Sequence, residues 1–210
     1  KLLFDAACDW ARQKGAEFIC GPCSVTGTDG DENKGLLVNC FDRPPVILNT
    51  YNPEYYMELI EKYGFSKDYD VFAYYLDKNK LFSKDPEKVL EYAKKRYGFR
   101  IDTLNLNDLE NEIKAFKHVM DRAMPEDWPD LVPPSLDEIR ETTNRLVSLA
   151  DPSLIPIARC GDEPIGFGIA LPDYNQVLIH LNERISPLSA LKFLYYRKKI
   201  TGIRMFVVFV

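Results

Sequence analysis

The sequence predicts an α/β fold of the α+β kind, with a mixed, mainly antiparallel sheet flanked by helices. Apolar residues recur at helical spacing in several segments, for example over residues 108–124. Short apolar runs alternate with these segments, and the run over residues 203–210 is a strong candidate for a buried strand. The turn Gly161-Asp162 separates two such runs, which is typical of a β-hairpin. This mixture predicts a sheet with helices packed over it.

Helices are expected where an apolar period lies between good start and stop residues. Asn52 and Pro53 suit the first positions of a helix, and Gly64 suits its end. Ser135 and Glu138 have the spacing of a capping box. On this basis we expect helices at residues 2–14, 53–63, 85–97, 108–124, 135–150 and 187–199.

Strands are expected at short apolar runs between turn residues. Residues 36–41 form an apolar run that suits either a short strand or a turn. The other expected strands cover residues 16–19, 69–76, 99–104, 154–160, 165–172 and 200–210. We expect the helices at 2–14 and 53–63 to pack on a sheet that the first half of the chain forms.

Composition narrows the class of protein. The chain has 210 residues, 46% hydrophobic and 12% aromatic, enough for one large domain or two small ones. A net charge of −5 argues against non-specific nucleic-acid binding. No apolar run reaches the roughly 18 residues of a membrane span, so we expect no membrane partner. No basic and apolar leader is visible, and five cysteines suggest no disulfide framework, which together favour a cytoplasmic protein.

One cysteine pair raises the question of redox chemistry, because residues 20–23 (CGPC) have the spacing of a thioredoxin-like site. Such a site needs a helix that begins at the motif and stabilises the thiolate. Residues 24–35 are instead rich in Gly, Asp, Thr and Asn, which predicts a loop. A zinc site that adds Cys8 and Cys40 matches no common zinc module. We therefore predict ordinary buried thiols and no metal site.

Four segments resemble the GNAT superfamily of acetyl-CoA-dependent N-acetyltransferases. Residues 3–22 (LFDAACDWARQKGAEFICGP) and 52–76 (NPEYYMELIEKYGFSKDYDVFAYYL) are similar to the second half of such a domain. Residues 154–173 (LIPIARCGDEPIGFGIALPD) and 202–210 (GIRMFVVFV) are similar to the first half of another. A poorly characterised bacterial group of GNAT-like proteins shares the YNPEYY and PIGFGIALPDYNQ motifs.

The resemblance implies a division of the chain into three parts. Residues 1–80 are expected to be the C-terminal half of one GNAT-like domain, and 101–210 the N-terminal half of a second. Residues 81–100 would form a connecting helix and linker. The two halves are also compatible with one composite sheet. Because the sequence starts in a helix pattern and stops in a strand pattern, we expect it to be part of a longer protein.

The resemblance also implies an activity, an acyl-CoA-dependent transfer of an acetyl group to an unknown small-molecule or peptide amine. Acetyl-CoA is the expected cofactor. The Gly-rich loop that holds its pyrophosphate is absent at both ends, so we expect these 210 residues to bind acetyl-CoA weakly or not at all. A non-catalytic binding or scaffold module is the alternative. A weaker alternative is aminoacyl or peptidyl transfer from acyl-tRNA. The net charge of −5 counts against it, because a protein that binds tRNA is expected to be basic. The oligomeric state stays open.

The resemblance further points to a catalytic acid. In many members a tyrosine four residues before the Gly-Phe pair protonates the leaving thiolate, but Ile60 stands there. Tyr56, one helical turn earlier, is therefore the candidate acid. The alternative is that Tyr56 is an aromatic core residue.

Candidate substrate-binding residues follow the run 165–172. Asp173 lies where a strand meets a loop, and Asn175 and Gln176 beside it have side chains able to hold a ligand amide. The alternative is that Asp173 caps its own backbone turn. The two histidines, His118 and His180, have no triad spacing to a Ser or Cys and are expected to be ordinary surface residues.

Overall fold

The computed structural model describes residues 1–22, 35–46, 49–77, 80, 85–124, 133–181 and 186–210. The helices are α1 (Leu2–Gln13), α2 (Tyr55–Tyr63), α3 (Pro86–Tyr97), α4 (Leu109–Ala123), α5 (Leu136–Leu146), α6 (Asn175–Leu178) and α7 (Pro187–Arg197). The strands are β1 (Arg100–Thr103), β2 (Pro156–Cys160), β3 (Glu163–Pro172) and β4 (Ile203–Phe209). Short 3₁₀ turns cover Leu106–Asp108 and Pro152–Leu154. The predicted α+β class with an antiparallel sheet is confirmed.

The chain divides into two compact units, Lys1–Tyr75 and Leu76–Val210. The predicted boundaries, at residues 80 and 100, and the composite sheet stay predictions. All the described strands belong to the second unit.

In the first unit, α1 and α2 pack through aromatic rings. The ring of Phe4 lies 5.0 Å from that of Tyr63 and 5.4 Å from that of Phe65. The Tyr63 hydroxyl donates a hydrogen bond to Asp5 at 2.8 Å. Burial among these rings, and the bond to Asp5, raise the pKa of Tyr63 above its usual value. Gly64 ends α2 in the left-handed region, at φ 117°, as the sequence predicts.

The predicted strands of the first unit are wrong. Residues 16–19 and 69–76 have extended or irregular backbone without ladder partners in the described part of this unit. A strand is stable only when a neighbour satisfies its N–H and C=O groups and covers one face. The aromatic run gains no such cover, since Tyr74 is 82% exposed. The helices α1 and α2 consequently pack on each other and not on a sheet.

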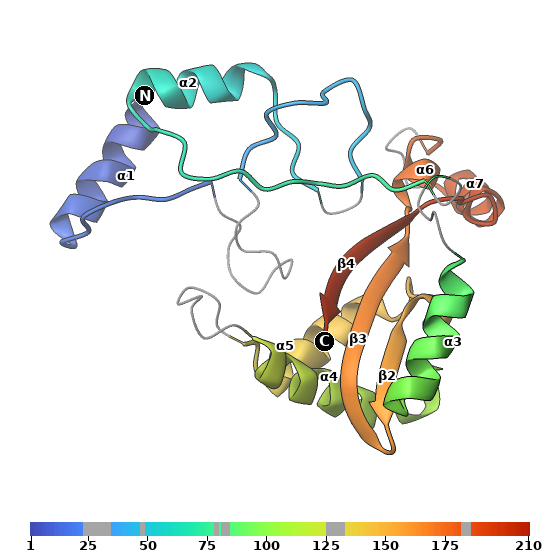
Figure 1. Ribbon diagram of the computed structural model, residues 1–210. Helices are drawn as coiled ribbons and strands as arrows, with labels where there is room; N and C mark the ends of the chain where they lie inside the picture. Colours follow the sequence, from blue (N-terminus) through green and yellow to red (C-terminus); the bar gives the residue numbers. More distant parts are fainter. Residues whose placement is uncertain (23–34, 47–48, 78–79, 81–84, 125–132, 182–185) are drawn as a thin grey trace. The chain divides into compact units, whose positions relative to one another are not determined.

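In the second unit the strands pair in the order β1-β2-β3-β4, and every pair is antiparallel. Figure 1 shows β2, β3 and β4 side by side. The hairpin between β2 and β3 turns at Gly161, whose φ of 59° lies in the left-handed region. Phe167 on β3 pairs with Ile157 on β2 and with Phe209 on β4. The predicted hairpin, with the last strand beside it, is confirmed.

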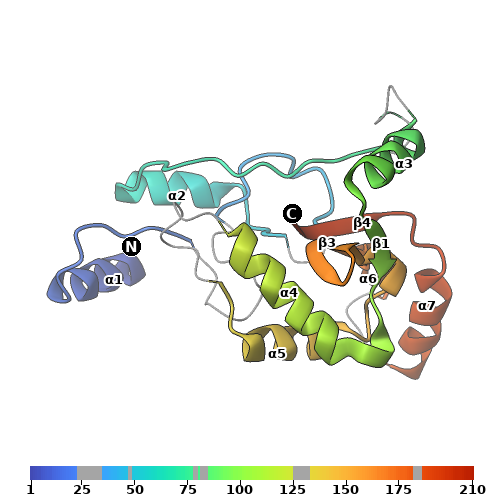
Figure 2. The ribbon, with the colours of Figure 1, turned by 60° about the horizontal axis from the view of Figure 1, so that its bottom comes forward.

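The core lies between this sheet and α4. Figure 2 shows α4 against the sheet, with α5 beside it. Arg140 of α5 binds Glu110 of α4 through two hydrogen bonds of 3.1 and 2.6 Å, which lower the pKa of Glu110. Both bonds of the predicted capping box form at the start of α5. The buried cluster consists of Leu104, Phe116, Val119, Ile155, Ile157 and Phe167.

Two glycines of β3 differ in the space around them, which gives a testable contrast. A Cβ atom at Gly166 would lie 2.9 Å from the backbone oxygen of Phe209, whereas at Gly168 the nearest atom would be 3.6 Å away, on Pro156. We expect Gly166→Ala to lower the free energy of unfolding by about 1–3 kcal/mol, because the β3–β4 backbone must shift. Gly168→Ala should change it by less than about 1 kcal/mol.

Amide hydrogen exchange of the β3 and β4 amides measures this difference, because it reports the opening free energy of those strands. The Gly168→Ala protein is the matched control, since it adds the same methyl group to the same strand. Equal loss of protection in both variants would show that the close approach at Gly166 does not limit the pairing of β3 with β4.

Candidate functional site

Tyr56, the candidate acid, lies on α2 in the first unit. It is 41% exposed, and its ring meets the ring of Tyr55 edge-on at 5.2 Å. The tyrosine of α2 that packs inward is Tyr63. A catalytic role for Tyr56 stays a prediction.

The three candidate binding residues meet at a polar junction of the second unit. The Asp173 carboxylate accepts a hydrogen bond from the backbone N–H of Asn175 at 3.2 Å and from the Gln176 amide at 3.1 Å. The Gln176 side-chain oxygen accepts from the backbone N–H of Thr201 at 3.2 Å. The Asp173 N–H donates to the Gly202 carbonyl at 2.9 Å. Asp173 therefore caps the turn into α6, and Gln176 ties that turn to the start of β4.

Both carboxylate oxygens of Asp173 accept a bond within the fold, and the role of these residues in binding a substrate stays a prediction. The neighbourhood is also closely packed, since a Cβ atom at Gly202 would lie 2.6 Å from the Gln176 amide nitrogen. Tyr56 belongs to the first unit and these three residues to the second.

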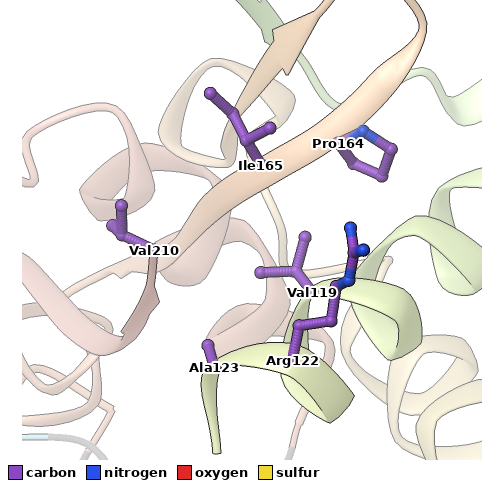
Figure 3. Close-up of a pocket in the computed structure, with 6 residues that line it drawn as sticks. All are labelled: Val119, Arg122, Ala123, Pro164, Ile165 and Val210. Carbon is purple, nitrogen blue, oxygen red and sulfur yellow. The ribbon is translucent and has the colours of Figure 1, made fainter.

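A pocket lies between the C-terminal end of α4 and the hairpin end of the sheet. Its volume is about 190 Å³, and Figure 3 shows the side chains around it. The lining residues are mostly apolar and come from three elements: Val119, Arg122 and Ala123 on α4, Pro164 and Ile165 on β3, and Val210 just after β4. An apolar pocket lined on one side by the cation of Arg122 suits a ligand with an apolar hydrocarbon chain and a polar or anionic end.

The rim of this pocket carries a cluster of three ionisable side chains. His118 and Arg122 lie one turn apart on α4, and Glu163 begins β3. Arg122 Nη1 donates to Glu163 Oε1 and lies 3.3 Å from Nε2 of His118. The same Glu163 oxygen lies 3.7 Å from His118 Nε2. Arg122 thus belongs both to the lining and to the charged cluster.

The contact with Arg122 favours one tautomer of His118. A guanidinium group only donates hydrogen bonds, so the nitrogen that faces it, Nε2, must carry the lone pair. The proton of the neutral ring is then on Nδ1. In this tautomer the Nε2 lone pair of His118 faces Arg122, which also lines the pocket.

A second ionic cluster lies at the core side of the sheet. Arg159 of β2 binds Glu112 of α4 at 2.5 Å and approaches Asp102 of β1 at 3.4 Å. The side chains of Arg159 and Glu112 are only 15% and 10% exposed. Because Arg159 and Glu112 are paired and have little access to solvent, this contact serves to fix α4 against the sheet.

The clear pKa shifts of the described residues have their causes in burial and in bonds that stabilise the fold, and none of them belongs to a residue that lines the pocket. Bonds from Ser135 lower the pKa of Glu138, and bonds from Ser153 lower that of Asp151. Ser135 is the N-cap of α5, and Asp151 is the N-cap of the 3₁₀ turn Pro152–Leu154. The described residues contain no group of three or more His, Cys, Asp or Glu side chains placed to hold a metal ion.

The cysteine prediction is corrected in one respect. Cys20 and Cys40 are exposed and not buried, because the segments that carry them lie on no sheet or helix in the described part of the first unit. No helix begins at residues 20–22. Cys23 lies outside the described residues, as do residues 24–34 of the predicted loop.

The sequence interpretation missed the rim cluster because it treated His118 as an ordinary surface residue. The spacing of His118 and Arg122, four residues apart on one helix, indicated that they share a face. Nothing local indicated Glu163, which reaches them only through the pairing of β3 with its neighbours. A long-range contact of this kind is visible only in the folded chain.

Comparisons with known proteins give two relatives. The chain is 28% identical over 203 residues to Protein YghO of Escherichia coli strain K12, covering 96% of this chain and 50% of that protein. It is 27% identical over 206 residues to the bacterial ceramide synthase of Caulobacter vibrioides strain NA1000 / CB15N, covering 97% of this chain and 51% of that protein. The chain therefore spans about half the length of the curated relatives it matches. No family model and no solved structure matches it.

These findings overturn the resemblance to the GNAT superfamily. The relatives match along nearly the whole chain and bear the names YghO and bacterial ceramide synthase. The fold gives a physical reason for the correction, since residues 16–19 and 69–76, taken as sheet strands of a GNAT-like domain, form no strand. The resemblance rested on four segments, and the two that lie in the first unit, residues 3–22 and 52–76, contain no strand. The chain is thus similar, at low identity, to a bacterial ceramide synthase.

Proposed function

We propose that the protein to which these residues belong is an N-acyltransferase that joins an acyl group to an amine. The observation that carries this proposal is the similarity of 97% of the chain to the bacterial ceramide synthase of Caulobacter vibrioides. A ceramide is the amide of a fatty acid and a long-chain amino alcohol. A ceramide synthase therefore forms a bond between an acyl carbon and an amine nitrogen.

The pocket and its rim suit such a reaction. Val119, Ala123 and Ile165 offer an apolar surface for part of an acyl or alkyl chain. His118 is the proposed proton acceptor, and Glu163 Oε1 lies 3.7 Å from its Nε2. Arg122 offers hydrogen-bond donors for a carbonyl oxygen that gains negative charge.

The proposed reaction is the aminolysis of an acyl thioester. The amine nitrogen attacks the carbonyl carbon of an acyl thioester, and a carbon–nitrogen bond forms while the carbon–sulfur bond breaks. His118 takes the proton that the nitrogen loses and passes it to the leaving thiolate, which departs as a thiol. We propose a coenzyme A thioester as the donor, since a thioester combines a reactive carbonyl with a good leaving group.

The test is an assay of the full-length protein with a long-chain amino alcohol, sphinganine, and either palmitoyl-CoA or acetyl-CoA. Mass spectrometry of the products measures the amide, and a thiol reagent measures released coenzyme A. We expect amide formation with at least one donor. Absence of an amide with both donors, in a folded protein, would contradict acyl transfer from coenzyme A and favour the scaffold alternative.

The role of His118 gives a further prediction. His118→Gln should lower kcat/KM of the full-length protein about a hundredfold, because general-base catalysis is lost while the side chain keeps a similar size. His180→Gln is the matched control, because His180 stacks on Tyr196 at 4.0 Å and is not among the residues of the pocket or its rim. We expect it to retain activity. A loss of equal size in both variants would exclude a specific role for His118.

A further inference from the structure

The helix α7 is apolar on two opposite faces. On its inner face, Phe193 stacks on Tyr174 with ring centroids 5.9 Å apart, and Tyr196 stacks on His180 at 4.0 Å. A helix at a protein surface usually presents polar residues on its other face. Here the outer face carries Leu188, Leu191 and Tyr195, which recur at spacings of three and four residues.

This outer face is left open to solvent. Leu188 is 66% exposed, Leu191 65% and Leu194 56%. The neighbouring helix α6 contacts α7, and at its end Leu178 and Ile179 are also exposed. Exposed apolar groups gathered on one helix mark an interaction surface more often than leucines scattered singly.

The charges around the leucines indicate what this surface meets. Residues 186–210 contain five basic residues and no acidic residue, although the whole chain has a net charge of −5. Lys192, Lys198 and Lys199 are exposed and lie on or beside the leucine face. Lys199 lies over the ring of Tyr195 at 4.1 Å and donates to its hydroxyl at 2.7 Å.

Leucines flanked by lysines, with a tyrosine at the border, have the chemistry of an interfacial helix. The apolar face enters the boundary between headgroups and acyl chains, and the cations remain among anionic headgroups. A protein partner with acidic residues around its binding site fits less well. The three leucines and the tyrosine project from one short helix and do not line a groove that would hold a partner segment. A nucleic acid would not cover leucines.

We propose that α7 docks on the surface of a bilayer that contains anionic phospholipid. No helix in the described ranges is long and apolar enough to cross a bilayer, and the proposal concerns the surface alone. It departs from the sequence-based expectation of no membrane partner, which rested on the absence of a spanning segment. It stands on the geometry and charge of α7 and does not depend on the proposed acyl transfer.

The test is co-sedimentation of the whole chain with vesicles. We expect binding to vesicles of phosphatidylcholine with 30 mol% phosphatidylglycerol to be at least tenfold stronger than to pure phosphatidylcholine, on the order expected for several lysines near an anionic surface. Raising NaCl from about 0.05 to 0.5 M should weaken it, since screening shortens the reach of the charges.

Two double variants separate the contributions of the leucines and the lysines. Leu188→Ser/Leu191→Ser and Lys198→Ala/Lys199→Ala should each lower the partition coefficient about tenfold or more. Leu2→Ser/Leu3→Ser is the matched control for the leucines, because those residues are 85% and 87% exposed on α1. Lys88→Ala/Lys95→Ala on α3 matches the change in charge. Both controls should bind as the unchanged chain does.

Several outcomes would overturn the proposal. One is equal binding to neutral and anionic vesicles, and another is no binding to either while circular dichroism shows a folded chain. A third is a change of oligomeric state in the Leu188→Ser/Leu191→Ser protein, measured by analytical ultracentrifugation without lipid. That result would assign the face to a second copy of the chain. Each outcome is independent of whether the full-length protein forms an amide.

Discussion

Phe167→Ala is expected to destabilise the second unit by about 3–5 kcal/mol, a large part of the stability of a typical domain. Phe167 is 4% exposed, and its ring lies 4.7 Å from that of Phe116 and 5.6 Å from that of Phe209. It thus joins α4 to two adjacent strands. Removing the ring leaves a cavity that Phe116 and Phe209 cannot close without moving α4 or β4.

Amide hydrogen exchange of β2, β3 and β4 measures this loss, because it reports on the second unit even if the first unit unfolds separately. Tyr92→Ala on α3 is the control within the same unit, since Tyr92 is 63% exposed. We expect little change in that variant. Similar losses in the two variants would show that the ring cluster around Phe167 is not the centre of the core.

The second unit could be predicted because its signals are local. The turn at Gly161 requires a left-handed backbone, and only a few residue types adopt it readily. Ser135 and Glu138 fix the start of α5 through contacts three residues apart. Apolar periods then orient α4 and α5 toward the sheet. In this part of the chain, the turn and cap residues predict the same elements that the packing of α4 and α5 on the sheet requires.

The first unit could not be predicted to the same extent. Residues 69–76 have the aromatic and β-branched composition of a strand, but composition does not supply a partner. Whether such a run pairs depends on backbone far away in the sequence. The helices were predictable, since each one satisfies its own backbone groups, and α1 and α2 form, although α2 begins at Tyr55 and not at the expected Pro53.

The candidate site shows the same limit. Asp173 and Gln176 were noticed because they follow a strand; the structure gives them bonds within the turn, and their role in binding stays a prediction. The cluster of His118, Arg122 and Glu163 combines a helix with the first residue of a strand 41 residues after Arg122. No pattern in the sequence connects the two. Chemistry that arises from tertiary contact needs the fold before it can be recognised.

The ionic contact between Glu112 and Arg159 leads to the second large effect. We expect Glu112→Leu and Arg159→Met each to destabilise the second unit by about 3 kcal/mol or more, because each leaves a charge with little solvent and a missing partner. Asp102, 3.4 Å from Arg159, offsets only part of the loss in Glu112→Leu. The double variant Glu112→Leu/Arg159→Met should be less destabilised than the sum of the two single variants.

The reason lies in the position of the pair, between α4 and β2 at the side of the apolar core. Two apolar side chains of similar length can fill that space without a desolvated charge, so the double variant restores what each single change removes. The same cycle on Glu110 and Arg140 is the control, because that pair is 49% and 35% exposed, and its coupling should be much smaller. Additive losses at Glu112 and Arg159, measured by exchange of the β2 amides, would show that solvent reaches the pair and that α4 is held to the sheet by its apolar contacts alone.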